Sequence, residues 1–371
     1  MKVAVPKEVK NHEYRVAITH AGVHELVTAG HEVFIETQAG IGSSITDDEY
    51  VAAGAKILDT ADATWAAGDL ILKVKEPIAS EYHRMRDGQT LFTYLHLAAS
   101  PECTDALLDA GVTSIAYETV QTPDGALPLL APMSEVAGRL AAQAGAHHLM
   151  RQGGGRGILM GGVPGVHPAR VVVLGGGVSG VNAAAIALGM QAEVSLLDLN
   201  VNRLREIDRQ FQGRIRTVAS NTFQLEGAVL DADLVIGAVL VPGAKAPKLV
   251  SNALVSGMRP GSVLVDISID QGGCFEDSGP TTHADPTYMV HNSVFYCVAN
   301  MPGAVPHTST FALTNVTLPY TMALANKGWK QALRDDLSLR HGLSTYGGSI
   351  TSEPVADAHG RDWTSPDEVV A

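Results

Sequence analysis

The sequence predicts an α/β protein built from two doubly wound domains, one of which is inserted into the other and makes it discontinuous. Short apolar segments alternate with helical segments throughout the 371 residues, a pattern typical of parallel sheets covered by helices. A glycine-rich turn follows the apolar segment at 171–174, and beyond Pro306 a further helical segment leads into a polar tail. We therefore expect a first domain over residues 1–130, an inserted domain with a connecting helix over 131–305, and a second connecting helix with a return to the first domain over 306–371.

The composition is that of an ordinary globular protein that acts on small molecules. Apolar residues make up 46% of the chain and charged residues 18%, and 26 basic against 39 acidic side chains give a net charge of −13. This negative charge argues against a nucleic-acid partner, because binding to a phosphate backbone requires clusters of basic residues and the sequence shows no such cluster. Residues 171–192 are uncharged and long enough to imitate a membrane span, but their glycines, Ser179 and Asn182 favour strand, turn and helix instead.

The cysteines indicate a reducing compartment. Cys103, Cys274 and Cys297 are widely spaced and show neither a disulfide framework nor the paired spacing of a metal site. The first strand-like segment is followed at once by charged residues at 7, 8 and 10, which does not fit the core of a secretion signal. We predict reduced thiols and a cytoplasmic location.

Four apolar segments before residue 100 fit the strands of a parallel sheet, and they are residues 2–6, 31–36, 69–75 and 90–95. Thr19 suits the N-cap of an intervening helix that Gly30 ends, and Ser100 with Pro101 opens another helix. The proline and glycine within 122–125 suit a turn. We therefore expect a hairpin at the domain edge, formed by segments 114–120 and 127–130.

The inserted domain is expected to hold at least five strands, at residues 171–174, 193–197, 234–239, 262–269 and 294–299. Helical spacing of alanine and leucine predicts a helix over 133–151, and a second helix is expected over 308–326. Both helices are expected to bridge the two domains. The glycine-rich residues 153–165 are predicted to form a loop.

After residue 170, a strand, a glycine-rich turn, an alanine-rich helix and a second strand follow in the order of a dinucleotide-binding unit. Gly175 permits the tight turn, Gly177 lets backbone N–H groups approach a pyrophosphate, and Gly180 lets helix and strand pack closely. Asp198 ends the second strand, can accept both ribose hydroxyls, and favours NAD over NADP because a 2′-phosphate would meet its charge. Arg203 weakens that preference slightly, and it is either a solvated helix residue or a contact of the adenosine end.

Four polar side chains lie at the predicted carboxyl ends of strands, where open parallel sheets bind ligands, and they are Arg15, Lys75, His96 and Asp270. An arginine fork can hold the carboxylate of a small acid, and an imidazole suits proton transfer. A lysine amid apolar residues must face an acid or a cavity. An exposed loop position for Arg15 and a structural ion pair for Lys75 are the alternatives.

Asp270 competes with Asp266 for the role of a functional acid. Asp266 lies within its predicted strand and is better suited to a structural hydrogen-bonded role, whereas Asp270 reaches the end of the strand and can approach a nicotinamide. Together these residues would support hydride transfer. One cation would hold a carboxylate, a second would polarise the adjacent carbonyl or imine, and a histidine and an acid would handle protons and water.

Six segments of the chain resemble bacterial alanine dehydrogenases, members of the alanine dehydrogenase and transhydrogenase alpha-subunit family. They are PKE with EYRVAIT within 6–19, LKVKEP at 72–77, LHLAA at 95–99, AYETVQ at 116–121, PMSEVAGRLAAQ at 132–143 and DISIDQGGCFE at 266–276. The resemblance extends from Met1 to about Thr345. It implies reversible oxidation of L-alanine by NAD to pyruvate and ammonia, in a homohexamer whose cofactor domain is inserted into the substrate domain.

The resemblance also implies roles for individual residues. Arg15 and Lys75 would bind the substrate on its carboxylate and carbonyl side, and His96 and Asp270 would be the acid/base pair. Cofactor contacts would come from Ser134, Val178, Ser179, Asp198, Arg203, Ser220, Val239, Leu240, Ile267, Ser268, Ile269, Asp270, Val298, Ala299, Asn300 and Met301, in addition to the three glycines.

Two positions depart from the pattern of relatives. Some relatives carry an arginine where this chain has Gly279, so one phosphate or adenosine contact is expected to be missing or replaced. Some use a histidine in a cation site at the position of Lys327, and because a cationic side chain is a poor metal ligand, we predict no metal here. The main alternative function is the nucleotide-binding module of a proton-translocating transhydrogenase, and a further one is an NAD-binding protein without catalysis.

Overall fold

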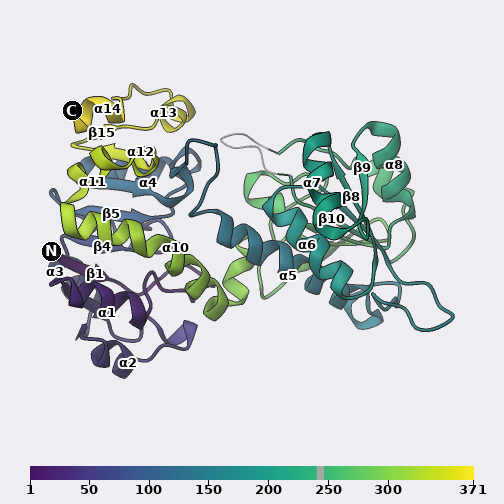
Figure 1. Cartoon of the computed structure of the whole chain (residues 1–371), viewed down its shortest axis with the longest axis horizontal. Coiled ribbons are helices and arrows are strands. Elements are labelled where there is room, and N and C mark those ends of the chain that lie inside the picture. Colours follow the sequence, from purple (N-terminus) through teal and green to yellow (C-terminus); the bar gives the residue numbers. More distant parts are fainter. Residues whose placement is uncertain (240–245) are drawn as a thin grey trace. The chain divides into compact units, whose positions relative to one another are not determined.

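The chain folds into two compact units, which a computed structural model describes over residues 1–239 and 246–371. Residues 1–133 and 305–371 form the first unit, and residues 134–304 form the second. Figure 1 shows the yellow-green C-terminal elements beside the purple and blue N-terminal ones in the first unit. The predicted fold class, with one domain inserted into a discontinuous other, is confirmed.

The first unit is built on an eight-stranded sheet. Its strands are β1 (Lys2–Val5), β2 (Glu32–Glu36), β3 (Lys56–Leu58), β4 (Leu70–Leu72), β5 (Thr90–Thr93), β6 (Thr113–Ala116), β14 (Leu343–Tyr346) and β15 (Ser349–Ile350). The order across the sheet is β15-β14-β6-β5-β4-β1-β2-β3, and the pairs are parallel except for those of β14 with β6 and with β15. The polar tail therefore adds two antiparallel strands to the first sheet.

The helices of the first unit are α1 (His20–Thr28), α2 (Asp47–Ala52), α3 (Ala61–Ala67), α4 (Pro101–Asp109), α10 (Pro306–Lys327), α11 (Trp329–Asp335), α12 (Leu337–Arg340), α13 (Glu353–His359) and α14 (Pro366–Val370). The Thr19 hydroxyl accepts the N–H of Gly22 at the start of α1, and Gly30 follows the helix with a φ of +87°. Both predicted ends of this helix are confirmed, because a side-chain cap and a left-handed glycine are local signals.

The expected hairpin around residues 122–125 is wrong. The turn itself is present, since the Gly125 N–H donates to the Thr122 carbonyl at 2.8 Å. However, β6 pairs with β5 in parallel and with β14, and residues 127–130 form no strand. One partner of β6 precedes it by about 20 residues and the other follows it by more than 200, and a local turn pattern reveals neither pairing.

The second unit holds a seven-stranded sheet in its described part. Its strands are β7 (Arg170–Leu174), β8 (Glu193–Asp198), β9 (Arg216–Ala219), β10 (Leu234–Gly237), β11 (Val263–Asp266), β12 (Thr287–Val290) and β13 (Ser293–Tyr296). The order is β12-β13-β11-β10-β7-β8-β9, with only the β12–β13 pair antiparallel among these strands. The edge strands β9 and β12 were not predicted.

Helices cover this second sheet on both faces. They are α5 (Ala131–Leu149), whose first residues belong to the first unit, α6 (Val178–Gly189), α7 (Val201–Phe211), α8 (Thr222–Asp231) and α9 (Asn252–Ser256). Val171 and Val173 of β7 pack in one buried cluster with the alanines of α6, and Val172 and Leu174 pack in the opposite cluster with α8 and α9. Burial on both faces explains why β7 is a continuous apolar run.

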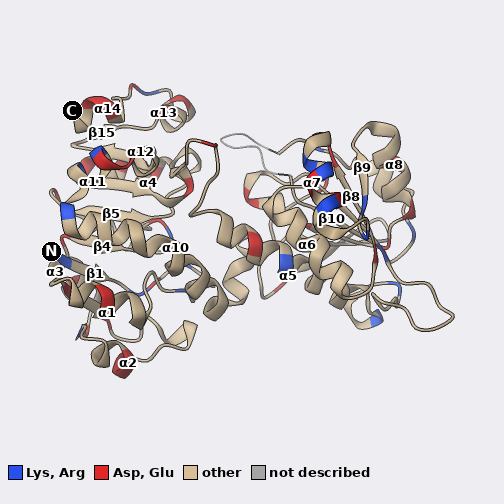
Figure 2. Cartoon of the chain, viewed as in Figure 1, with Lys and Arg blue, Asp and Glu red and all other residues tan. Residues whose placement is uncertain are grey.

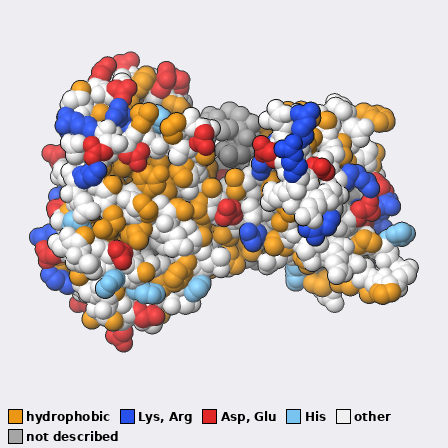
Figure 3. Space-filling model, in the orientation of Figure 1, with side chains coloured by type: hydrophobic (Ala, Val, Ile, Leu, Met, Phe, Trp, Pro, Cys, Tyr) orange, Lys and Arg blue, Asp and Glu red, His pale blue; other side chains and the backbone are white. Residues whose placement is uncertain are grey.

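Basic and acidic residues occur along the chain in both units, as Figure 2 shows. Figure 3 shows apolar side chains gathered over the first unit around α10. The half-buried apolar residues of this helix include Phe311, Val316, Leu318, Tyr320 and Met322. No helix within the described residues is long and apolar enough to span a bilayer.

The three cysteines are free and buried, in agreement with the prediction of reduced thiols. Burial raises the pKa of Cys103 to about 12 and that of Cys297 to about 11, and it also raises the pKa of Cys274. Because the thiolate is the reactive form, we expect no rapid reaction of the native protein with a thiol reagent at pH 8. The chain unfolded in denaturant should release three equivalents, and one fast equivalent in the native state would contradict this burial.

Candidate active site

Four adjacent strands of the first sheet end at one edge, and the segments that follow them carry the candidate residues. In sheet order these strands are β1, β4, β5 and β6, all parallel. Arg15 follows β1, Lys75 follows β4 and His96 follows β5. The fold therefore brings the three predicted residues of the first unit to the same sheet edge, where α/β proteins bind ligands.

Arg15 is buried rather than an exposed loop residue, with only 2% of its surface accessible. Its Nε donates to Glu13 Oε1 at 2.7 Å, its Nη2 donates to Glu13 Oε2 at 2.6 Å, and its Nη1 lies 3.0 Å from the Met133 sulfur. Burial by itself lowers the pKa of Arg15, but the Glu13 carboxylate outweighs it and the pKa is raised. The guanidinium is therefore a permanent positive charge.

A second lysine of this segment, Lys73, is the one that is completely buried, and it has two acid partners. Lys73 is completely buried, and its Nζ lies 3.1 Å from a Glu8 oxygen and 2.9 Å from a Glu81 oxygen. Lys75 is partly exposed two residues further on. The Glu8 carboxylate also accepts the N–H of Val74 at 2.6 Å and the N–H of Lys75 at 3.4 Å. Sequence reasoning missed this cluster, although a second lysine in the apolar segment was a signal for it.

His96 lies directly after β5 in an unusual backbone conformation. Its φ is +50°, in the left-handed region that non-glycine residues seldom adopt. Glu118, which follows β6, accepts the His96 N–H at 2.6 Å and the Leu95 N–H at 3.2 Å, and its Oε1 lies 3.8 Å from His96 Nδ1. The imidazole stacks against Tyr94 and is 44% exposed. Glu118 thus stabilises the backbone that presents this imidazole.

The second unit contains the glycine turn in the predicted geometry. Gly175 has a φ of +101°, and a Cβ on Gly180 would lie only 1.8 Å from the Gly175 carbonyl oxygen. Gly177 is the N-cap of α6, has no side-chain cap, and would place a Cβ in open space. Backbone N–H groups at the start of this helix are therefore available to an anionic group. These features fit a pyrophosphate at the turn.

Asp198 and Arg203 both contact this turn. Asp198 ends β8 and accepts the Gly176 N–H at 2.6 Å and the Asn200 N–H at 2.7 Å. Arg203 Nε donates to the Gly176 carbonyl at 2.7 Å, and Arg203 Nη1 pairs with Glu206. Each Asp198 oxygen keeps a second lone-pair direction for a ribose hydroxyl. Arg203 is thus bound to the glycine turn and is not simply solvated.

The remaining cofactor candidates of the second unit follow its central strands at the carboxyl end. Val239 follows β10, Ile267 and its neighbours follow β11, and Val298 begins the group after β13. Ser268 Oγ donates to the Val239 carbonyl at 2.7 Å, which joins two of these segments. Ser220 follows β9, Ser134 lies in α5, and Leu240 lies outside the described residues.

Asp266 and Asp270 lie in different environments. Asp266 is fully buried and accepts the N–H groups of Ser268 and Cys274, each at 2.9 Å, and burial raises its pKa. Asp270 is exposed in the short helical turn Ile267–Gln271 that follows β11. The predicted strand at 262–269 ends at Asp266 because this residue caps that turn. Asp266 is structural, and Asp270 is available to a ligand.

Gly279, the position where some relatives carry an arginine, has room for a side chain. Its N–H donates to the Tyr288 hydroxyl at 2.7 Å, and a Cβ there would meet only that hydroxyl, at 3.8 Å. Lys327 is paired with Asp335 at 2.6 Å.

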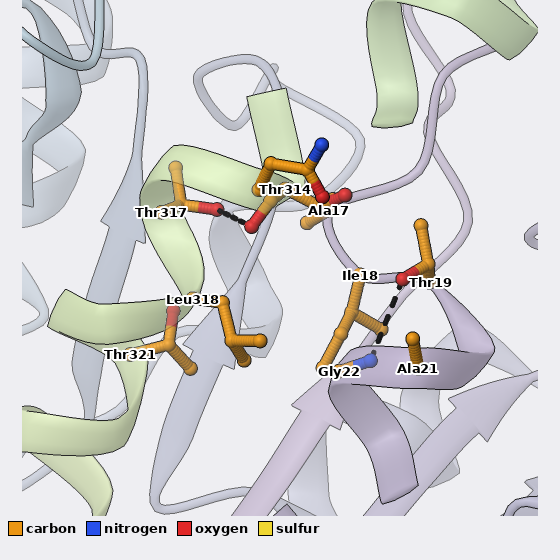
Figure 4. A pocket seen from close by; sticks show the side chains of 10 residues that line it. Ala17, Ile18, Thr19, Ala21, Gly22, Thr314, Thr317, Leu318 and Thr321 are labelled. Atoms are coloured by element: carbon orange, nitrogen blue, oxygen red, sulfur yellow. Dashed lines mark hydrogen bonds between the residues drawn. The ribbon is translucent and has the colours of Figure 1, made fainter. Parts of the chain in front are cut away.

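A small cavity of about 40 Å³ lies in the first unit between the start of α1 and the middle of α10 (Figure 4). Its walls include Ala17, Gly22, Thr314, Leu318 and Thr321, and its lining contains no ionisable side chain. This space is small, and its lining lacks groups for acid/base chemistry. It is not the candidate active site.

Comparison with known proteins agrees with this geometry. The model of the alanine dehydrogenase/PNT N-terminal domain matches residues 4–137, and that of the C-terminal domain matches residues 141–353. The chain belongs to the alanine dehydrogenase/PNT family. The resemblance inferred from the sequence is confirmed, and the chain is an oxidoreductase.

Several members of the family are similar over their whole length. An alanine dehydrogenase of Mycobacterium tuberculosis (strain ATCC 25618 / H37Rv) is 65% identical over 371 residues, all of both chains, and one of Mycolicibacterium smegmatis is 67% identical over 356 residues, 96% of each chain. A solved L-alanine dehydrogenase has a TM-score of 0.94 at 52% identity, with 97% of this chain and 99% of that one covered. A transhydrogenase from Sinorhizobium meliloti has a TM-score of 0.81 at 25% identity, covering 95% and 99%.

Proposed function

We propose that the protein catalyses the reversible oxidative deamination of L-alanine by NAD to pyruvate and ammonia. The observation that carries this proposal is the 65% identity over the entire chain with a curated alanine dehydrogenase. The geometry supports it because Arg15, Lys75 and His96 follow strands that end at the same edge of the first sheet. Fold alone would not favour one chemistry over another, so the site residues matter more than the architecture.

Arg15 and Lys75 are the proposed substrate-binding residues. A buried guanidinium held in a fixed orientation can bind the carboxylate shared by alanine and pyruvate. Lys75 is proposed to contact the substrate on its carbonyl side and to polarise it during reductive amination. One charged hydrogen bond of this kind contributes roughly 1.5–3 kcal/mol, enough to set the affinity for a small acid.

The proposed cofactor is NAD, which the glycine turn and Asp198 fit. The open start of α6 suits the pyrophosphate, and Asp198 suits the ribose hydroxyls while disfavouring a 2′-phosphate. Bound NAD supplies the acceptor for the hydride that leaves the Cα of L-alanine. The proposed cofactor contacts at Val239, at 267–270 and at 298–301 follow the carboxyl ends of the same sheet.

His96 and Asp270 are proposed to move the protons of the reaction. The amine must lose a proton before hydride leaves, water must then add to the resulting imine, and the nitrogen must be protonated to leave as ammonia. An imidazole can both accept and donate a proton, which suits these steps, and an exposed carboxylate can assist in handling the water.

The decisive experiment follows NADH absorbance with purified protein in both directions. L-alanine and NAD should form NADH, and pyruvate should oxidise NADH only when ammonium is present. Oxidation without ammonium would identify a hydroxy-acid dehydrogenase instead. No turnover in either direction by folded, NAD-binding protein would favour the transhydrogenase-like module or a protein without catalysis.

Asp270→Asn provides a sharper test of the acid/base assignment. Loss of a positioned carboxylate should lower kcat by roughly 10²- to 10⁴-fold. NADH binding, measured by nucleotide fluorescence, should persist, and Asp285→Asn, an exposed acid of the same unit, serves as the control with unchanged kcat. An unchanged kcat in Asp270→Asn would remove this residue from the mechanism.

We also propose a homohexamer, as the family resemblance implies. The half-buried apolar residues of α10 give an isolated chain an incompletely covered face, which association of subunits would bury (Figure 3). Light scattering should return a mass near six times 38.9 kDa. A monomer at micromolar concentration would contradict the proposal.

A further inference from the structure

Glu13 lies two residues before Arg15 in the segment between β1 and α1 and is almost completely buried. Three donors of Arg15 reach its carboxylate: Nε at 2.7 Å and the backbone N–H at 3.1 Å to Oε1, and Nη2 at 2.6 Å to Oε2. The carboxylate therefore fixes both the backbone and the far end of the same arginine. Such a double attachment leaves the guanidinium little rotational freedom.

The two edges of the Arg15 guanidinium have different neighbours. Glu13 occupies the edge formed by Nε and Nη2 in a fork of two parallel hydrogen bonds. Nη1, on the other edge, lies 3.0 Å from the thioether sulfur of Met133. Sulfur is a weak acceptor, so a substrate carboxylate would be a much stronger partner for that edge.

We infer that Glu13 is a positioning residue for the substrate carboxylate, acting through the orientation of Arg15. The inference rests on the proposed function, in which Arg15 binds alanine and pyruvate. A buried ion pair gains little stability over apolar packing of the same volume, so a fully buried Glu–Arg pair at a ligand-binding edge points to function. Misplacement of a binding group by about 1 Å can cost as much as 10²-fold in rate.

Two substitutions separate the charge of Glu13 from its geometry. Glu13→Gln has the same shape but turns an amide donor toward Nη2, so the fork is lost. Glu13→Asp keeps the charge and withdraws it by one methylene, so only part of the fork can form. We expect the KM for pyruvate, at saturating NADH and ammonium, to rise roughly 10- to 100-fold in Glu13→Gln and less in Glu13→Asp, with the KM for NADH unchanged.

The control is Asp233→Asn. Asp233 is another buried carboxylate paired with an arginine, Arg156, at 3.1 Å, but it precedes β10 at the amino end of the second sheet. This variant should lower stability while leaving the KM for pyruvate unchanged. A rise equal to that of Glu13→Gln would mean that loss of any buried ion pair has the same effect, and the inference would fail.

A double-mutant cycle with Arg15→Met completes the test. It keeps the inference testable even if Glu13→Gln alone, which leaves Arg15 buried without its carboxylate, fails to fold. The double variant removes both buried charges, and in the Arg15→Met background Glu13→Gln should have no further effect on the KM for pyruvate. If Arg15→Met leaves that KM unchanged, the proposed role of Arg15 itself is wrong. If Arg15→Met raises it but Glu13→Gln does not, the function stands and the role of Glu13 is refuted. An independent further rise in the double variant would also refute it.

Discussion

Lys73→Met is expected to destabilise the first unit by about 3–5 kcal/mol, because it leaves the buried carboxylates of Glu8 and Glu81 without the ammonium that both contact. All three tryptophans, Trp65, Trp329 and Trp363, belong to this unit. Tryptophan fluorescence therefore follows the unfolding of the first unit. Urea is the suitable denaturant because it adds no ionic strength. The midpoint should fall while the slope of the transition stays the same.

The loss in Lys73→Met should be larger at pH 8 than at pH 5. Burial raises the pKa of Glu8 and the Lys73 ammonium opposes that rise, so the substitution moves the pKa further up. The folded variant then binds more protons than the unfolded chain, and its stability falls as pH increases. Lys73 itself has a raised pKa and remains charged throughout this range. The wild-type protein therefore keeps the stabilisation that this ammonium provides. A pH-independent loss would refute this electrostatic account.

Lys56→Met is the matched control for this substitution. Lys56 pairs with Glu32 at 2.7 Å, but the two side chains are 62% and 48% exposed. Exposed ion pairs contribute little because water and salt screen them. The urea midpoint of this variant should be unchanged, and a shift comparable to that of Lys73→Met would mean that burial is not the deciding factor.

Gly180→Ala is expected to abolish detectable NADH binding. The new methyl carbon would lie 1.8 Å from the Gly175 carbonyl oxygen and 3.3 Å from Val173 Cγ1. The first of these is a backbone atom of the glycine turn, so the turn or the start of α6 must move by more than an ångström. The N–H groups proposed to hold the pyrophosphate would move with it. NADH fluorescence titration should show at least a roughly 10²-fold weaker affinity.

Gly189→Ala provides the control on the same helix. Gly189 is the last residue of α6, and a Cβ there meets no atom within 4 Å. Alanine is favoured over glycine in a helix, so this variant should bind NADH normally and unfold no more easily than wild type. Normal NADH binding by Gly180→Ala itself would mean that the turn has another way to relax, and that close packing at Gly180 is not required.

The sequence was sufficient for features whose physical cause is local. The unit from β7 to β8 could be predicted because each of its glycines has a backbone or packing requirement, and because β7, buried on both faces, is a continuous apolar run. The cap of α1 at Thr19 was also predictable from neighbouring residues. Strand ends predicted the sheet edge that carries Arg15, Lys75 and His96, since parallel strands place their carboxyl ends together.

Only the tertiary structure decided which residues are partners of one another. Glu8 and Lys73 are 65 residues apart, so no local pattern indicates that they form a buried pair. The strand β6 pairs with β5 and with β14 instead of forming the expected hairpin, and β14 lies more than 200 residues further along the chain. Local patterns determine the elements and their ends, whereas the burial of charges and the choice of strand partners depend on contacts that exist only once the chain has folded.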